Sequence, residues 1–450
     1  MILLFDLILI FLFCILGVCI GVVTGLLPGL HVNNIAIILL SMSGMIVALC
    51  HPLYVFGFSE SFLFLLISVF IISTSVSHTF HDAIPTTFLG APEEDTALSI
   101  LPAHALLLEG RGYEAVYLSA FGSFSAIMIC FLLIYPIRFL IGSPLMLYST
   151  LREIMPWVLI AISILMIATE RGRIDDSNIR RRSFSIFSGM LFASLVFFLA
   201  GAFGLIVLDL PVDSPLGLSS PVLFPALSGL FGTPTLINSL MTKPVIPEQR
   251  IEEIVFSKKE KGASILSAIT GSLAGILVSI IPGITSATGT ILAMNIRGES
   301  SNRQTIVTLS AVNTASAFSV ILVLFIILRP RSGVALAVNE LVAVEEWNSL
   351  FLPSTLVYLI IAILLAGCLS YFLTLKIGGL FAKHFQNISY SSLIVSTIVM
   401  IILLVFLFTG IIGLLVLMVA TLIGLLPVLW GVRRSHCMGI LLIPVILHFI

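Results

Sequence analysis

Two proline-glycine steps, each followed by polar residues, are the parts of this sequence best suited to hold a ligand. The first step is Pro28-Gly29, and His31, Asn33 and Asn34 follow it. Proline removes a backbone donor and glycine tolerates unusual dihedral angles, so the step predicts a break in a helix. The N–H groups at a broken helix end attract anions. We therefore expect these five residues to bind an anionic substrate.

The second step repeats this arrangement in the other half of the chain. Pro282-Gly283 is followed by Thr285, Ser286 and Thr288. Hydroxyl groups donate and accept hydrogen bonds, so they suit the orientation of a polar ligand. We assign these residues to the same expected substrate site.

Four further residues of the second half join this site. Asn313-Thr314 interrupts an apolar run, and Arg329 and Arg331 flank a proline. A guanidinium fits a carboxylate in bidentate fashion, and an amide with a hydroxyl can orient it. The alternatives are hydrogen bonds between helices for Asn313 and Thr314, and contact with lipid headgroups for the two arginines.

Six titratable residues occur in or beside the most polar stretch of an otherwise apolar region: His78, His81, Asp82, Glu93, Glu94 and Asp95. Ionisable groups at membrane depth are costly and by default mark a pathway. We expect these six residues to couple a proton or cation to the movement of the substrate.

Two alternatives apply to these titratable residues. The acids at 93–95 follow Pro92, so they could instead stabilise the first turn of a helix. His78 and His81 are spaced for one helix face beside Asp82, as metal ligands can be, but the sequence has no HExxH pattern. We expect no metal and no cofactor.

The composition indicates the elements that must position these residues. Hydrophobic residues make up 59% of the chain and charged residues 10%, against about 25% charged in soluble domains. The mean hydropathy is +1.21. We therefore predict an all-α polytopic membrane protein, with apolar segments near residues 2–27, 30–50, 61–80, 115–137, 154–168, 184–208, 222–241, 263–281, 284–296, 305–328, 350–375, 393–409, 411–430 and 437–450.

An internal repeat surrounds the two proline-glycine steps. The first copy reads Gly17-x3-Gly21-x3-Gly25-x2-Pro28-Gly29, and the second reads Gly271-x3-Gly275-x3-Ser279-x2-Pro282-Gly283. Small residues at every fourth position let another helix approach closely. The pattern predicts two helices that pack tightly and then break.

The distribution of Lys and Arg predicts opposite orientations for the two copies. Residues 1–60 contain neither, whereas the second copy lies between basic segments at 258–261 and 297–303. Basic loops stay in the cytoplasm, which also places 171–182 and 243–261 inside and 209–220 outside. Loop 136–152 holds Arg138 and Arg152 against this scheme. We expect two inverted-topology repeats with broken helices or re-entrant hairpins, at 1–168 and 263–450, joined by 169–262.

These motifs resemble those of the large membrane subunit of the tripartite tricarboxylate transporter family. The similar segments are Gly21-x3-Gly25-x2-Pro28-Gly29, Gly90-Ala91-Pro92, the stretch 103–115 and Ile281-Pro282-Gly283. The resemblance implies a permease that takes up carboxylate anions with a small membrane subunit and an extracytoplasmic solute-binding protein. The acids at 93–95 replace small residues of the family pattern, which indicates a divergent member.

The sequence therefore predicts a secondary transporter in the cytoplasmic membrane, not an enzyme. Its substrate would be a small carboxylate-like anion, moved with a proton or sodium ion. No GxxxxGK[ST] loop for ATP is present, and the net charge of -1 argues against binding nucleic acid. A lipid-phosphate flippase is the alternative, and an intramembrane metalloenzyme built on His78, His81 and Asp82 is a third reading.

Overall fold

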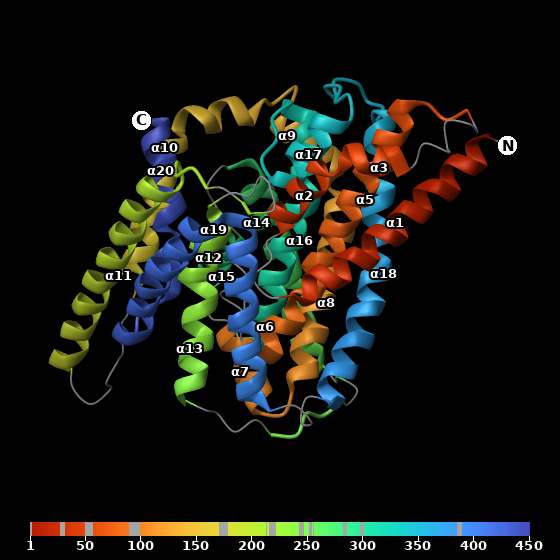
Figure 1. The fold of residues 1–450 in the computed structure, drawn as a ribbon. Helices are drawn as coiled ribbons and strands as arrows, with labels where there is room; N and C mark the ends of the chain where they lie inside the picture. The colour runs from red at the N-terminus through yellow and green to blue at the C-terminus, as the bar shows by residue number, and fades with distance from the viewer. Residues whose placement is uncertain are drawn as a thin grey trace.

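The regular elements that the structure describes are all helices, in agreement with the predicted fold class (Figure 1). The structure is a computed structural model. It describes residues 2–27, 32–49, 57–89, 100–170, 179–212, 214–215, 222–242, 247–251, 254, 256–281, 286–297, 301–384 and 389–450.

The first half of the chain forms helices of very different length. They are α1 (Ile2–Leu26), α2 (Val32–Ser41), α3 (Ser43–Leu49), α5 (Glu60–His81), α6 (Ala83–Leu89), α7 (Ile100–Leu108), α8 (Gly112–Leu132), α9 (Ile134–Ile141), α10 (Leu147–Ala168) and α11 (Ile179–Val207).

The second half continues with α12 (Leu223–Leu227), a π-helical turn (Ser228–Gly232) and α13 (Thr233–Thr242). Next come α14 (Lys258–Ile280), α15 (Ser286–Arg297), α16 (Asn302–Ile327), α17 (Gly333–Leu341) and α18 (Ser354–His384). The last elements are α19 (Tyr390–Trp430), a 3-10 helix (Arg434–Met438) and α20 (Gly439–Phe449).

The described residues contain eight helical segments that are long and apolar enough to cross a membrane. Large apolar side chains stay exposed on α1, α11 and α19, among them Phe5, Phe198 and Leu422. Exposed apolar surface on this scale suits contact with lipid. The chain is a multi-pass membrane protein. By contrast, α2 has 10 residues and α15 has 12, which is too short for the roughly 20 residues that a span needs.

The glycine stripes form two helix pairs with the same packing register. A Cβ atom added to Gly17 would lie 2.5 Å from the carbonyl oxygen of Phe70 in α5 and 2.8 Å from the Ser73 Cβ. A Cβ atom added to Gly271 would lie 2.6 Å from the carbonyl oxygen of Thr308 in α16 and 2.9 Å from the Ala311 Cβ. The backbones of α1 and α5, and of α14 and α16, therefore touch without an intervening side chain, as the spacing predicted.

The next turn repeats this correspondence. A Cβ atom on Gly21 would meet the carbonyl oxygen of Thr74 and the Cβ of Ser77, while one on Gly275 would meet Val312 and Ala315 in the same way. In Figure 1, α5 descends from α3 toward α6 and α7, and α16 ascends toward α17 at the upper edge. The two buried helices thus run in opposite directions.

The two pairs are held together by crossed contacts. α8 packs on α16, while α18 packs on α5, and α8 and α18 contact each other. In the same crossed sense α7 contacts α16 and α17 contacts α5. α8, which follows the α1–α5 pair in the chain, therefore covers α16. α18, which follows the α14–α16 pair, covers α5, so both halves of the chain build the centre of the molecule.

A third group of helices, α10, α11, α12, α13, α19 and α20, packs beside these pairs. The backbone of α19 breaks at Gly410, whose φ is 63°, at the junction between the predicted segments 393–409 and 411–430. A residue with a side chain rarely adopts this φ, so glycine permits the break.

Two buried charged residues, Glu170 and Arg138, form hydrogen bonds to segments that lie between helices. Glu170, after α10, accepts hydrogen bonds from the Arg433 backbone N–H at 3.0 Å and from the His436 Nε2 at 2.8 Å. Arg138 in α9 donates to the Trp347 carbonyl oxygen at 3.1 Å and is 5% exposed. The rule that basic loops stay in the cytoplasm applies to Lys and Arg in loops. Because Arg138 is buried in a helix, it does not indicate on which side of the membrane loop 136–152 lies.

Candidate functional site

One small cavity between the two halves is lined by Asp82 and Asn313, which the sequence assigned to coupling and to substrate binding. It lies where α5 meets α6 and where α7, α8 and α16 pack around that junction. The space holds about one water molecule, so the site is closed in this structure. Its polar lining residues are Thr79, Asp82, Thr87, Ser119, Ser310 and Asn313.

Asp82 occupies the junction between two helices. α5 ends at His81 and α6 begins at Ala83, and the Thr86 hydroxyl donates to the Asp82 carbonyl oxygen at 2.7 Å. The residue is 3% exposed within the 30-residue apolar span Glu60–Leu89. A carboxyl group at such a position carries a desolvation cost and marks a candidate ion site.

Hydroxyl and amide groups from α8 and α16 form the opposite side of the cavity, and Ser286 of α15 contacts one of them. The Ser119 Oγ lies 2.7 Å from the Ser310 Oγ. The Ser286 hydroxyl donates to the Asn313 Oδ1 at 3.4 Å. Asn313 thus links the polar patch after the second proline-glycine step to the cavity. Short polar groups of this kind can replace water around a polar ligand.

Ser119 and Ser310 were not predicted as site residues. Both lie in apolar helices that contain other serines, and only the packing of α8 on α16 brings these two together. One signal was available in the sequence, because Ser119 and Ser123 are four residues apart on one face of α8. The Ser123 hydroxyl also reaches the Ser310 carbonyl oxygen, at 3.5 Å.

The two histidines near Asp82 belong to another interface. The His78 Nδ1 lies 3.2 Å from the Thr24 Oγ1 of α1, and the His81 Nδ1 lies 2.7 Å from the Ser77 carbonyl oxygen. A Cβ atom added to Gly25 would lie 2.9 Å from the His81 Cβ. Both histidines therefore face α1. Within the described residues, no group of three His, Cys, Asp or Glu side chains is placed to hold a metal.

The remaining described residues of the predicted substrate site do not line the cavity. The Asn33 Oδ1 accepts the N–H of Gly333 at 3.0 Å, which ties α2 to the start of α17. Thr314 is 1% exposed within α16. Arg329 and Arg331 follow the end of α16, which lies about 21 Å from Asn313 along the helix axis at a rise of about 1.5 Å per residue. They line a separate pocket.

Part of the predicted site lies outside the described residues. This holds for Pro28, Gly29, His31, Glu93, Glu94, Asp95, Pro282, Gly283 and Thr285, and for the side chains of Asn34 and Thr288.

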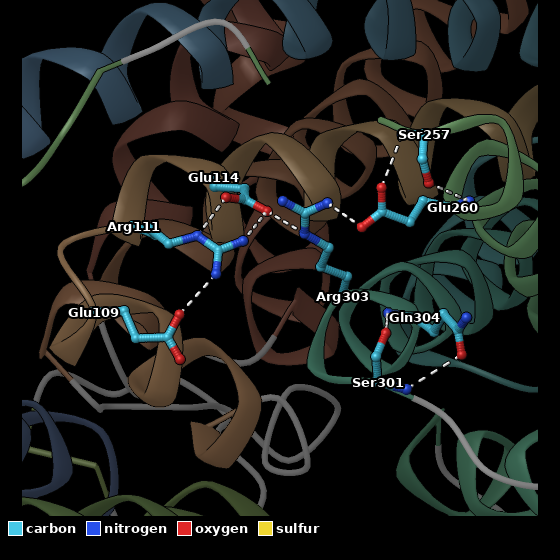
Figure 2. Close-up of polar contacts among 8 residues, drawn as sticks. All are labelled: Glu109, Arg111, Glu114, Ser257, Glu260, Ser301, Arg303 and Gln304. Atoms are coloured by element: carbon cyan, nitrogen blue, oxygen red, sulfur yellow. Dashed lines mark hydrogen bonds and ion pairs between the residues drawn. The ribbon is translucent and has the colours of Figure 1, made fainter. Parts of the chain in front are cut away.

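A chain of ion pairs lies beside the cavity at the starts of α8, α14 and α16 (Figure 2). The Arg111 Nε is 2.8 Å from a Glu114 carboxylate oxygen, and the Arg303 Nε is 2.6 Å from the other. Arg303 also reaches Glu260 at 2.9 Å, and Arg111 reaches Glu109 at 2.7 Å. Hydrogen bonding to Glu114 raises the pKa of Arg111.

Capping residues, which can be recognised in the sequence, stabilise the first turns of α14 and α16. Ser257 and Glu260 form a capping box at α14, and Ser301 and Gln304 form one at α16. Each pair satisfies backbone N–H groups that the helix leaves open. The segment before α14 is attached as well, because the Gln249 side chain accepts the Gly112 N–H at 2.9 Å and donates to the Leu107 carbonyl oxygen at 3.1 Å.

Comparison with known proteins gives a family for this arrangement. Residues 11–439 match the model of the tripartite tricarboxylate transporter TctA family. The chain is also 31% identical over 446 residues to an uncharacterized protein of Methanocaldococcus jannaschii, with 98% of each chain covered. No solved structure matches the chain.

Proposed function

We propose, from the premise that this chain belongs to the tripartite tricarboxylate transporter TctA family, that it moves a small carboxylate-like anion across the cytoplasmic membrane. The family makes the chain a secondary-transporter permease. We further propose that a proton or sodium gradient drives the movement. The observation that best supports this proposal is the closed polar cavity between the two halves of the chain, which is formed by α5, α6, α7, α8 and α16.

The cavity suits an anion that binds through hydrogen bonds. Ser119, Ser310 and Asn313 offer donors to carboxylate oxygens, while the nearby apolar residues Ile306 and Leu309 exclude water. The cavity is too small for the substrate in this structure. The surrounding helices must therefore move apart before the substrate can bind.

Asp82 is proposed as the coupling residue. A carboxylate beside the anion would repel it, whereas a carboxyl group that binds a proton or faces a sodium ion would not. Loading of the ion would thus favour loading of the substrate. The acids at 93–95, His78 and His81 remain further candidates for coupling from the sequence pattern.

We propose that the two halves form inverted repeats and exchange access between the two sides of the membrane. The shared register of the α1–α5 and α14–α16 pairs and the opposite directions of α5 and α16 support this arrangement. The proline-glycine steps at 28–29 and 282–283, with His31, Asn34, Thr285 and Thr288, are proposed to complete the substrate site. The middle part, residues 169–262, connects the repeats.

The family resemblance also suggests partners. We propose that a small membrane subunit and an extracytoplasmic solute-binding protein deliver substrate to this chain. Co-purification of the native complex from membranes is the direct measurement of this assembly.

Uptake into proteoliposomes tests the proposed site. Asn313→Ala should weaken the apparent affinity for the carboxylate about tenfold, because it removes a hydrogen bond to a charged group. Asn302→Ala is a matched control, since Asn302 is exposed at the start of the same helix. Unchanged affinity in Asn313→Ala would exclude the cavity as the substrate site, and uptake that ignores both gradients would exclude coupling.

A further inference from the structure

The last residue of α15, Arg297, lies half-buried against α14 and α16. Its Nη1 donates to three hydroxyl groups, those of Ser267 and Thr270 in α14 at 2.9 and 3.4 Å and that of Thr308 in α16 at 2.8 Å. Each of these hydroxyls donates its own proton to the carbonyl oxygen four residues earlier in its helix. The three oxygens therefore act as acceptors, and they fix one side of the guanidinium.

The other edge of this guanidinium has no acceptor among the described residues. Its Nε and Nη2 are both buried, and neither donates a hydrogen bond to these residues. The two nitrogens form the fork that holds a carboxylate through two parallel hydrogen bonds. Arg111 shows this arrangement in the same protein, because its Nε and Nη2 donate to the two Glu114 carboxylate oxygens at 2.8 and 2.9 Å. Arg297 therefore keeps a carboxylate-binding edge that no described residue uses.

The helices around Arg297 supply no carboxylate to this edge. α14, α15 and α16 contain one acidic residue, Glu260, and it pairs with Arg303 at 2.9 Å. No carboxylate of a described residue forms an ion pair with Arg297. A buried charge is costly unless it is paired. Hydrogen bonds that only tie the three helices together need Nη1 alone, so they do not account for the buried fork.

Arg297 lies on one side of the central cavity. Ser286, the first residue of α15, contacts Asn313 of the cavity, whereas Arg297 is at the opposite end of this helix. Thr308, which contacts Arg297, is about 7.5 Å closer than Asn313 to the start of α16, at a rise of about 1.5 Å per residue. The distribution of Lys and Arg predicts that this start faces the cytoplasm. α15 thus connects the cavity to Arg297 on the predicted cytoplasmic side.

We propose that the Nε and Nη2 of Arg297 bind the carboxylate group of a small organic acid on the cytoplasmic side of the cavity. One source of this group is the transported anion, in which case the inference rests on the proposed function. The other source is a separate organic acid from the cytoplasm. Because both nitrogens are covered in this structure, the carboxylate binds after the packing around the end of α15 opens, as the cavity itself must.

Isothermal titration calorimetry of the purified full chain with acetate, succinate and citrate tests the site, in a chloride buffer of constant ionic strength. The wild type should bind at least one of the three acids. Arg297→Lys should lower that affinity about tenfold, because lysine keeps the charge but lacks the fork. Arg250→Lys makes the same change at an exposed arginine and should leave the affinity unchanged. Absence of binding by the wild type, or equal affinities in the wild type and Arg297→Lys, would overturn the proposal.

Ser267→Ala provides a second test that does not alter the arginine. It removes one acceptor that fixes the guanidinium, so the affinity should fall about threefold. If Arg297→Lys does not fold, an unchanged affinity in Ser267→Ala counts against the site. Both substitutions are also made in the Asn313→Ala protein, so that a lost affinity is assigned to Arg297 and not to the cavity.

Uptake into proteoliposomes identifies the source of the carboxylate. Weaker binding together with weaker uptake in Arg297→Lys would assign it to the transported anion, and weaker binding alone would assign it to a separate organic acid. The uptake measured for Asn313→Ala tests the proposed function independently. Binding that depends on Arg297 therefore stands even if the cavity fails as the substrate site, and the reverse holds as well.

Discussion

Arg303 and Glu114 are joined by a 2.6 Å ion pair that connects the first turn of α16 to the first turn of α8. The same two helices line the cavity further along, through Ser310 and Ser119. Separation of the helix starts would therefore widen the cavity from this end. The distribution of Lys and Arg predicts that this end faces the cytoplasm, so we expect the ion pairs to close the cytoplasmic side.

The first prediction concerns the strength of this closure. In a double-mutant cycle, Arg303→Gln and Glu114→Gln should show a coupling free energy of about 1–2 kcal/mol, because both side chains are largely buried. Their exposed fractions are 21% and 11%. Unfolding of the four purified proteins in detergent measures the coupling. Arg303 with Glu260 is the control pair and should couple less, since Glu260 is 46% exposed. Equal coupling for both pairs would contradict the assignment.

The second prediction concerns Asp82. Asp82→Asn should leave some substrate movement but remove its stimulation by the proton or sodium gradient, because the amide cannot exchange a proton or attract a cation. Uptake with and without each gradient measures the effect. Asp209→Asn serves as the control, since Asp209 is exposed after α11. Stimulation that persists in Asp82→Asn would move the coupling role to other carboxyl groups.

The third prediction tests the close backbone contacts within the α1–α5 pair and within the α14–α16 pair, here called the glycine seams. Gly21→Ala and Gly275→Ala should each lower the free energy of unfolding by about 1–3 kcal/mol, because the added methyl group strikes backbone atoms. Gly262→Ala, at an open position of α14, should raise it by about 0.5–1 kcal/mol. Chemical unfolding in detergent gives all three values. An unchanged free energy of unfolding for Gly21→Ala or Gly275→Ala would contradict the close backbone contact at that position.

The fourth prediction follows the ionisation of Glu170. Burial raises the pKa of this carboxyl, but hydrogen bonds from His436 and Arg433 outweigh it, so the net pKa is lowered. A lowered folded-state pKa stabilises the protein above the unfolded value of about 4.3, and the stabilisation is lost as the pH falls below that value. The melting temperature of the wild type should therefore drop in this acidic range.

The variant Glu170→Gln isolates this contribution. It should be less stable than the wild type at pH 7 by about 1.5–3 kcal/mol, because it removes a buried carboxylate that accepts hydrogen bonds from Arg433 and His436, and it should show a weaker acid dependence. Glu153→Gln is the control, since Glu153 is exposed in α10. Parallel pH profiles for the wild type and Glu170→Gln would assign the acid sensitivity to another group.

Sequence patterns predicted the features that depend on local spacing. Glycine at every fourth position predicted close helix pairs, and α1–α5 and α14–α16 have them, because a missing side chain on one face has a direct packing consequence. The break at Gly410 falls at the predicted boundary between the apolar segments 393–409 and 411–430.

The composition of the cavity depends on packing that spacing alone does not encode. Asp82 was grouped with His78 and His81, which are near in sequence, yet the helix directs the histidines to α1 and Asp82 to the cavity. Ser119 and Ser310 meet only because α8 crosses from one half to the other. The ion pair between Glu114 and Arg303 likewise joins residues that no sequence motif relates.

The glycine seams also determine which parts of the molecule can shift. Helices whose backbones interlock without side chains cannot slide past each other, so α1 with α5, and α14 with α16, behave as two rigid bodies. We therefore expect relative motion at the surfaces between these pairs, such as the contact of Val116 in α8 with Gly378 in α18. We expect the contacts of α8 and α18 to change between the two access states, while the contacts within each glycine-packed pair stay the same.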